Sequence, residues 1–318
     1  MTLDDLQTLA DLIRAEIGRA VHGQDDAVDL LLTALLARGH CLLEGPPGTA
    51  KTLLAQAMAA ALHLDFGRIQ FTPDLMPGDV LGVNIFDFAT SAFRLTKGPV
   101  FTDILLADEI NRAPPKTQAA LLQVMNEGTA TIDGTDYALD PAFFVVATQN
   151  PIEQQGTYPL PEAQLDRFLF NVLIDFPAEQ AELDILIRHA AQPLERSART
   201  AEIARLVDRE ALAEARRLVD GIRLEERILG YILAIVRRTR EDPDVRHGAS
   251  TRAADALAGA VRALAALAGR DYALPDDVQR LAGPALNHRI VLGPTAEMEG
   301  RTPTQVIDGI VGQIDAPR

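Results

Sequence analysis

The sequence contains a glycine-rich segment followed by a lysine, a combination that could bind a phosphate group. Gly45-Pro46-Pro47-Gly48-Thr49-Ala50-Lys51-Thr52 follows an apolar run and precedes a helical pattern, which is the context of a phosphate-binding loop. Backbone N–H groups and the helix dipole would hold the anion, Lys51 would reach the β- and γ-phosphates, and the Thr52 hydroxyl would ligate Mg²⁺. A Gly/Pro-rich turn that only connects strand to helix is the alternative.

One position departs from the strict pattern, which has glycine immediately before the lysine. This chain has Ala50 there. We expect the methyl group to be tolerated if the φ angle of Ala50 stays negative.

Two adjacent carboxylates follow a second apolar run. Ile104-Leu105-Leu106-Ala107 leads directly into Asp108 and Glu109, as in a Walker B strand at the carboxyl edge of a sheet. Asp108 would hold Mg²⁺, and Glu109 would polarise the attacking water as general base. A solvated pair that caps the next helix is the alternative for these residues alone.

A third apolar run, Phe143 to Ala147, ends in Thr148-Gln149-Asn150. Its amide would lie at the same sheet edge, where Asn150 could hydrogen-bond the attacking water or a γ-phosphate oxygen. Alternatively, Asn150 opens a turn with Pro151.

These residues need a scaffold that brings three strand ends together. Strand-length apolar runs at 40–44, 104–107 and 143–147 alternate with helical patterns at 51–62 and 114–126, which predicts an α/β domain with a doubly wound parallel sheet. Beyond Phe176-Pro177 the pattern is helical. There, an apolar stripe runs from Ile228 to Val236, one helix has Ser250 as N-cap, and the last helix is expected to start at Pro275.

The composition of the chain limits which kinds of partner we expect it to bind. The 318 residues include 30 Lys and Arg against 45 Asp and Glu, a net charge of −15, which disfavours nucleic acid. No basic leader or long apolar segment is visible, so we expect a cytoplasmic protein with no membrane insertion. The one cysteine, Cys41, lies in an apolar run and is expected to be a buried thiol, and the six histidines lack zinc-site spacing.

Longer runs carry a resemblance to a known family. The sequence resembles the MoxR family of AAA+ ATPases, in the clade marked by an insert in the second helix. The likeness extends from Val21 to Ile290. A magnesium-chelatase motor subunit fits these runs less well. The runs that carry the resemblance are Glu44–Thr52, Phe71–Leu75, Leu105–Gln118, Ala147–Glu153 and Gly156–Phe168.

The resemblance implies two domains and a set of site residues. Residues 1–176 would form the AAA+ nucleotide-binding domain and residues 177–318 a small all-helical lid. Arg167 matches the arginine finger that reaches a neighbouring subunit's γ-phosphate, and Arg252 matches the sensor 2 arginine. An Asp166–Arg167 surface pair and an exposed arginine at a helix start are the alternatives. The expected nucleotide-binding residues are Val21, His22, Gly23, Gly45, Pro46, Pro47, Gly48, Thr49, Ala50, Lys51, Thr52 and Leu53.

Two further segments of the first domain are candidates for contact with a substrate. Residues 74–98, with Phe86, Phe88 and Phe93, resemble the clade's insert, and residues 129–140 predict a β-hairpin with a turn at Asp133-Gly134. Both could face a ring pore and touch substrate. The alternative is that their apolar residues only pack the insert against the domain.

The resemblance therefore implies a function, cofactors and partners. We expect ATP and Mg²⁺ as cofactors of a hexameric ATPase that remodels, activates or inserts a metal or cofactor into a client protein, with a von Willebrand factor A domain protein as partner. A nucleic-acid translocase is one alternative, although residues 129–140 contain no Lys or Arg. A nucleotide-switched scaffold is another.

Overall fold

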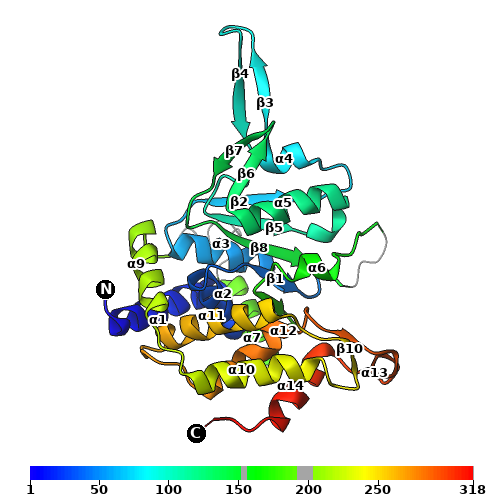
Figure 1. Cartoon of the computed structure of the whole chain (residues 1–318). Helices are drawn as coiled ribbons and strands as arrows, with labels where there is room; N and C mark the ends of the chain where they lie inside the picture. The colour runs from blue at the N-terminus through cyan, green and yellow to red at the C-terminus, as the bar shows by residue number, and fades with distance from the viewer. Residues whose placement is uncertain (152–155, 192–202, 318) are drawn as a thin grey trace.

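The computed structural model describes residues 1–151, 156–191 and 203–317. Its centre is a five-stranded parallel sheet with the strand order β2-β5-β8-β1-β9. This confirms the predicted parallel α/β sheet (Figure 1). Its strands are β1 (Cys41–Glu44), β2 (Phe66–Gln70), β5 (Ile104–Asp108), β8 (Phe144–Gln149) and β9 (Phe170–Leu173).

Alternate residues of the central strands pack on opposite faces of the sheet, because successive side chains of a strand point to opposite sides. Ile104 and Leu106 of β5 join a core with the first three helices, whereas Leu105 and Ala107 join a core under α5 (Pro115–Glu127). Both faces are therefore covered, which explains the continuous apolar runs of the sequence. Cys41 is fully buried, as expected, and burial raises the pKa of its thiol.

Three helices cover one face of the sheet and connect it to the second half of the chain. They are α1 (Leu3–Ala20), α2 (Asp25–Leu36) and α3 (Lys51–Ala61). Helix α1 begins with a capping box between Thr2 and Asp5, which satisfies N–H groups of its first turn. Its buried side chains share one core with α11 (Thr251–Leu267). The sheet and the C-terminal helices thus pack on the same N-terminal layer.

The second half is largely helical, as predicted (Figure 1). The apolar stripe of α10, from Ile228 to Val236, is buried, and the Ser250 hydroxyl accepts a hydrogen bond from the Ala253 N–H at 3.3 Å. A short ribbon of two antiparallel strands interrupts the helices. The elements of this half up to the ribbon's second strand are α7 (Glu179–Ala191), α9 (Arg209–Asp220), α10 (Glu226–Thr239), β10 (Val245–His247), α11, α12 (Pro275–Leu286) and β11 (Val291–Leu292).

The prediction that the last helix starts at Pro275 is wrong. Two more helices follow α12, namely α13 (Pro294–Met298) and α14 (Pro303–Gln313). Helix α14 opens with a capping box in which the Thr302 hydroxyl accepts from the Gln305 N–H at 3.3 Å. The Thr-Pro-Thr-Gln pattern of residues 302–305 was a signal for that helix start.

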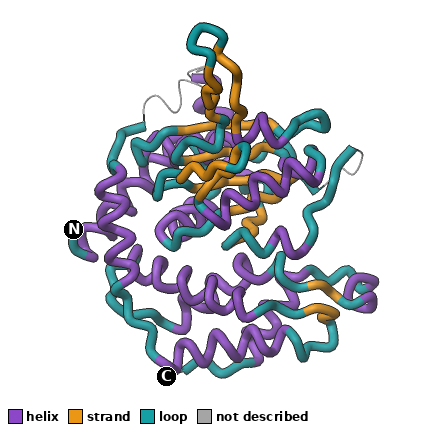
Figure 2. Tube along the Cα trace, turned by 45° about the horizontal axis from the view of Figure 1, so that its top comes forward, coloured by secondary structure: helices purple, strands orange, loops and turns teal. Residues whose placement is uncertain are grey.

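Two β-hairpins project from the first domain on the side away from the C-terminal helices (Figures 1 and 2). The first follows the short helix α4 (Pro77–Leu81) and consists of β3 (Gly82–Asp87) and β4 (Ala92–Lys97). The second, β6 (Thr129–Ile132) with β7 (Thr135–Ala138), confirms the predicted hairpin, and both turn residues, Asp133 and Gly134, have positive φ angles. The Asn84 amide donates to Asp133 Oδ2 at 2.8 Å, so the hairpins touch.

Within the described residues, no helix combines the length and apolar character needed to cross a membrane.

Candidate functional site

The phosphate-loop candidate lies between the end of β1 and the start of α3. The Lys51 ammonium donates to the carbonyl oxygens of Gly45 at 2.8 Å and Pro46 at 2.7 Å, and the Thr49 hydroxyl lies 3.3 Å away. Burial lowers the pKa of Lys51, while the nearby charges of Asp108 and Glu109 raise it. The loop thus folds around a partly buried cation at a helix N-terminus, where an anion is stabilised.

The condition under which a methyl group would be tolerated without strain at Ala50, a negative φ angle, is not met. Ala50 has φ 61° and ψ 19°, a left-handed conformation, and it is the N-cap of α3. An L-residue with a side chain pays about 1–2 kcal/mol for this conformation. The sharp turn from strand to helix imposes it, so the glycine of the strict pattern would relieve strain here.

Gly45 is required by a close approach of the next strand. A Cβ atom at this position would lie 2.0 Å from the Ile174 carbonyl oxygen, immediately after β9. A Cβ at Gly23 would likewise meet Pro177 at 3.3 Å and Ala181 at 3.2 Å. The segment 174–181 therefore contacts both the phosphate loop and the Val21–Gly23 stretch, of which Val21 is buried.

Asp108 is held at the end of β5 by groups from three other elements. Thr148 donates to its Oδ1 at 2.7 Å, Arg68 donates to its Oδ2 at 2.7 Å, and the Thr52 hydroxyl lies 3.5 Å from the same Oδ2. A hydroxyl and a carboxylate next to a lysine-bearing phosphate loop are the ligands that Mg²⁺ prefers when a nucleotide supplies the remaining oxygens. Thr52 and Asp108 therefore fit the predicted metal role.

Glu109 also has a left-handed backbone, with φ 56° and ψ 51°. Its N–H donates to the Thr148 hydroxyl at 2.8 Å, and its Oε2 accepts from Gln70 at 2.8 Å and from Arg112 at 2.9 Å. Non-glycine residues in such conformations concentrate at functional sites, where the surrounding contacts hold them. The carboxylate is thus fixed beside Asp108 by hydrogen bonds from β2 and from the short 3₁₀ helix Ile110–Arg112.

Three further residues belong to this site that were not predicted from the sequence, namely Arg68, Gln70 and Arg112. Arg68 and Gln70 alternate with the buried Ile69 on β2, so both point to one side of the strand, toward the carboxylates. A polar-apolar-polar alternation near the end of a strand was the available signal.

Asn150 follows β8 and is 8% exposed. The preceding residue, Gln149, pairs with Glu44, and its carbonyl accepts from the Gly45 N–H at 3.4 Å. Asn150 therefore lies at the same sheet edge as the phosphate loop, as its predicted role requires. Residues 152 and 153 of the matched run lie outside the described residues.

Arg167 lies at the opposite edge of the sheet from its own phosphate loop. It precedes β9, and the Leu169 N–H donates at 2.8 Å to the carbonyl of His40, which stands just before β1. Gly45 follows the end of β1, and a four-residue strand is about 13 Å long. Arg167 is half-buried, and its Nε atom is buried with no hydrogen-bond partner.

Arg252 lies beside Arg167 in the fold. Its Nη1 is 3.8 Å from Asp166 Oδ2, and Asp166 Oδ1 is 2.9 Å from Nε of Arg289, a buried residue after α12. The Asp166 and Phe168 carbonyls also accept hydrogen bonds from Arg289. The two candidate arginines therefore form one cluster, on the side of the sheet away from Lys51.

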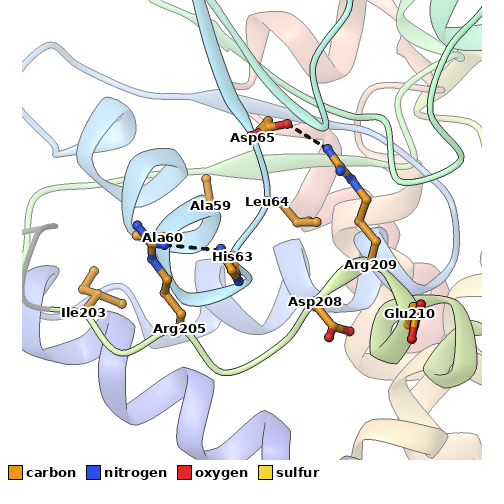
Figure 3. Close-up of a pocket in the computed structure, with 10 residues that line it drawn as sticks. All are labelled: Ala59, Ala60, His63, Leu64, Asp65, Ile203, Arg205, Asp208, Arg209 and Glu210. Carbon is orange, nitrogen blue, oxygen red and sulfur yellow. Dashed lines mark hydrogen bonds and ion pairs between the residues drawn. The ribbon is translucent and has the colours of Figure 1, made fainter.

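A cavity of about 580 Å³ lies elsewhere, between the end of α3 and the start of α9 (Figure 3). Arg205 contacts His63 at 3.3 Å there, and Arg209 contacts Asp65 at 2.8 Å. None of the predicted site residues lines it. We place the candidate site at the phosphate-loop edge, because Lys51 and the carboxylates of Asp108 and Glu109 meet there.

A parallel sheet in this strand order, a phosphate loop after β1 and two adjacent carboxylates at the end of β5 define a P-loop ATPase of the AAA+ class. The family model described as "ATPase family associated with various cellular activities (AAA)" matches residues 40–170, and the model described as "AAA lid domain" matches residues 237–310.

Curated relatives identify the family. "Chaperone MoxR1" of Mycobacterium tuberculosis is 38% identical over 95% of this chain and 81% of its own length. "Protein MoxR" of Methylorubrum extorquens is 32% identical over 93% and 91%, respectively. "Uncharacterized protein YeaC" of Bacillus subtilis is 44% identical over 99% and 97%. The chain belongs to the MoxR family of AAA+ ATPases.

A solved structure agrees with this assignment. The crystal structure of a candidate ATPase from Cytophaga hutchinsonii superposes with a TM-score of 0.90 at 38% identity, covering 99% of this chain and 97% of that one. The fold and the ATPase class are therefore shared over essentially the whole chain.

Proposed function

We propose that this ATPase hydrolyses Mg²⁺-ATP at sites shared between subunits of a ring and uses the reaction to remodel a client protein. The observation that carries the proposal is the separation of the arginines from their own phosphate loop. Arg167 and Arg252 cluster around Asp166 at the edge where β9 begins, whereas Lys51 and Glu109 lie at the edge where β1 and β5 end. A second copy of the chain would supply what each site lacks.

At the edge of the sheet that carries the phosphate loop, each group of residues would have its own role in binding or hydrolysing ATP. Gly45 to Leu53 would bind the phosphates through backbone N–H groups and the Lys51 ammonium, with Val21, His22 and Gly23 next to the adenine. Mg²⁺, held by Thr52 and Asp108, would neutralise charge on the phosphate oxygens. Glu109 would accept a proton from the attacking water, and Asn150 would orient that water.

The arginines would complete the site from the neighbouring subunit. The planar guanidinium of Arg167 suits the charge spread over a transferring phosphoryl group, and Arg252 on the same side would contact the same nucleotide. Such a head-to-tail contact closes into a ring, and we propose six subunits. We also propose a partner with a von Willebrand factor A domain. Because the reaction consumes ATP, we place it in the cytoplasm.

The β3–β4 hairpin supports a protein client over nucleic acid. Phe86, Phe88 and Phe93 form an aromatic cluster at the projecting end, with ring centroids 5.1 and 5.3 Å apart. Phe88 is 87% exposed and Phe93 is 72% exposed, so they do not serve the packing of the insert against the domain. Exposed aromatic clusters mark protein interaction sites, and the relative named as a chaperone favours that use here.

The test of this function is Mg²⁺-dependent ATP hydrolysis by the purified chain and by Glu109→Gln. The variant keeps the size and hydrogen bonding of the side chain but cannot accept the proton, so we expect the rate to fall by about 10²- to 10⁴-fold while ATP binding persists. Lys51→Ala should lose binding as well. Hydrolysis by Glu109→Gln at the wild-type rate would remove Glu109 from the mechanism, and its absence in the wild type would refute the function.

A further inference from the structure

Arg289 joins the lid to the segment that carries Arg167. Its Nη2 donates to the Asp166 carbonyl at 3.2 Å and to the Phe168 carbonyl at 2.9 Å, and these two carbonyls lie on either side of Arg167 in the chain. Its Nη1 donates at 2.9 Å to the carbonyl of Ala285, in the last turn of α12. One side chain thus binds both the end of a lid helix and the backbone around Arg167.

The Arg289 side chain is only 4% exposed. Its Nε lies 2.9 Å from Asp166 Oδ1, which makes an ion pair although the N–H does not point at that oxygen. Burial lowers the pKa of Arg289, while the charge of Asp166 raises it. Because a buried guanidinium is costly unless it is paired and hydrogen-bonded, these contacts fix its orientation. A planar group held in this way can keep the backbone that it binds in one position.

Two neighbouring residues attach the lid to the sheet without Arg289. The Asn287 amide donates to the Asn171 carbonyl on β9 at 3.1 Å, and His288 Nε2 lies 3.0 Å from the Phe168 carbonyl. Since a carbonyl oxygen can only accept, Nε2 of His288 carries the proton in this contact. The attachment of the lid to the sheet should therefore survive the loss of the Arg289 side chain.

We propose that Arg289 is a positioning residue for Arg167, and that through it the lid of one subunit controls ATP hydrolysis in the neighbouring subunit. This inference rests on the proposed function, in which Arg167 acts on the nucleotide of the next subunit. Loss of Arg289 impairs the arginine that a chain offers to its neighbour, while the phosphate loop of the same chain stays complete. A misplacement of about 1 Å can lower a rate by about 10²-fold.

The first test is Arg289→Met, because methionine fills a similar volume without a charge or a hydrogen-bond donor. We expect kcat to fall by about 10- to 100-fold. Affinity for a fluorescent, non-hydrolysable ATP analogue with Mg²⁺ should change by less than about twofold, since the loop edge is untouched. A wild-type kcat would overturn the proposal.

Arg289→Lys is the conservative variant. It keeps the cation but lacks the planar fork, so it should recover part of the rate, by about threefold or more over Arg289→Met. Binding of the ATP analogue shows that either variant is folded. If Arg289→Met does not bind the analogue, the comparisons below are made with Arg289→Lys.

The matched control is Arg270→Met, at the other end of α12. Arg270 also binds a carboxylate and a backbone carbonyl, because it donates to Asp277 at 2.7 and 2.8 Å and to the Tyr272 carbonyl at 3.1 Å. Its side chain is 22% exposed. The kcat of Arg270→Met should stay within about twofold of the wild-type value. A loss as large as that of Arg289→Met would show that general loosening of the lid is the cause and would overturn the proposal.

Mixing variants shows on which subunit Arg289 acts. When Arg289→Met is reassembled with Glu109→Gln, about one quarter of the junctions join an intact Glu109 to a correctly held Arg167. Hydrolysis should therefore recover to about one quarter of the wild-type rate. When Arg289→Met is reassembled with Arg167→Ala, every arginine on offer is defective, so we expect no recovery.

The opposite pattern, recovery with Arg167→Ala but not with Glu109→Gln, would place the effect of Arg289 on the site of its own chain. Recovery with neither variant would indicate a general structural defect. Each of these results would overturn the proposal.

A third mixture, Arg167→Ala with Glu109→Gln, separates this inference from the proposed function. If this mixture does not recover, the sites are not shared between subunits and the proposed function fails. If it recovers while Arg289→Met hydrolyses ATP at the wild-type rate, only the role of Arg289 is refuted.

Discussion

Two residues of the site combine a side chain with a left-handed backbone. Ala50 precedes the phosphate-loop lysine, and Glu109 is the proposed general base. The conformation of Glu109 is held by hydrogen bonds with Thr148, Gln70 and Arg112. The left-handed backbone of Glu109 therefore helps to orient its carboxylate, whereas the left-handed backbone of Ala50 orients only a methyl group.

We predict that Ala50→Gly stabilises the protein. The left-handed conformation costs alanine about 1–2 kcal/mol, and the extra backbone freedom of glycine in the unfolded chain costs about 0.5–1 kcal/mol. The free energy of unfolding in urea should therefore rise by up to about 1.5 kcal/mol. Ala60→Gly in α3 is the control and should lower it by about 1 kcal/mol. Equal losses in both variants would contradict the strain at Ala50.

The sequence predicted the residues of the loop edge better than their connections. Lys51, Asp108 and Asn150 each end or follow a strand-length apolar run, and parallel strands bring their carboxyl ends together, so their meeting follows from pattern alone. The roles of Arg68, Gln70 and Arg112 depend on which strands are neighbours and in what register. That information is absent from local periodicity, and the φ angle of Ala50 likewise depends on the turn from β1 to α3.

At the scale of elements, the strands β1, β5 and β8 and the β6–β7 hairpin were predictable, because burial on both faces and a turn dipeptide leave clear patterns. The edge strands β2 and β9 and the pairing of β3 with β4 were not predicted. Helix α13 was missed because it has only five residues, whereas α14 was missed although residues 302–305 carry a capping-box pattern. The exposure of the β3–β4 hairpin could not be predicted, because an apolar residue has the same letter whether it packs or projects. In the structure, its aromatic rings pack mainly on one another.

We predict that Phe88→Ser combined with Phe93→Ser abolishes the response to a client without affecting the ATPase site. Both residues are exposed, so the free energy of unfolding should change by less than about 0.5 kcal/mol each. The measurement is stimulation of ATP hydrolysis by a permanently unfolded, carboxymethylated polypeptide, with basal hydrolysis recorded in parallel. Met298→Ser, at a residue 82% exposed on α13, is the control. Retained stimulation in the double variant would show that clients bind elsewhere.

At the scale of the whole molecule, the sheet separates the two halves of the proposed reaction. The phosphate loop follows the end of β1, while Arg167 and Arg252 gather where β9 begins, close to the lid residue Arg289. Both edges belong to one chain, so a head-to-tail neighbour can pair one edge with the other. Contacts of Arg289 with the Asp166 and Phe168 carbonyls would carry lid movement to the Arg167 segment.

This arrangement predicts complementation between two inactive variants. Arg167→Ala keeps a complete loop edge but offers no arginine to its neighbour, and Glu109→Gln keeps the arginine but cannot hydrolyse ATP. Mixed at equal amounts and reassembled, about one quarter of the junctions should join an intact Glu109 to an intact Arg167, because each has an even chance in a head-to-tail ring. Hydrolysis should recover to about that fraction of the wild-type rate.

Each variant alone, and the two mixed without reassembly, are the controls. Specific activity of the wild type should also rise with protein concentration, because a site shared between copies exists only in the assembly. Activity per chain that is independent of concentration, an unimpaired Arg167→Ala, or a mixture no more active than its components would each place the whole site within one chain. Arg167 would then be a surface residue, since its own phosphate loop lies at the opposite edge of the sheet.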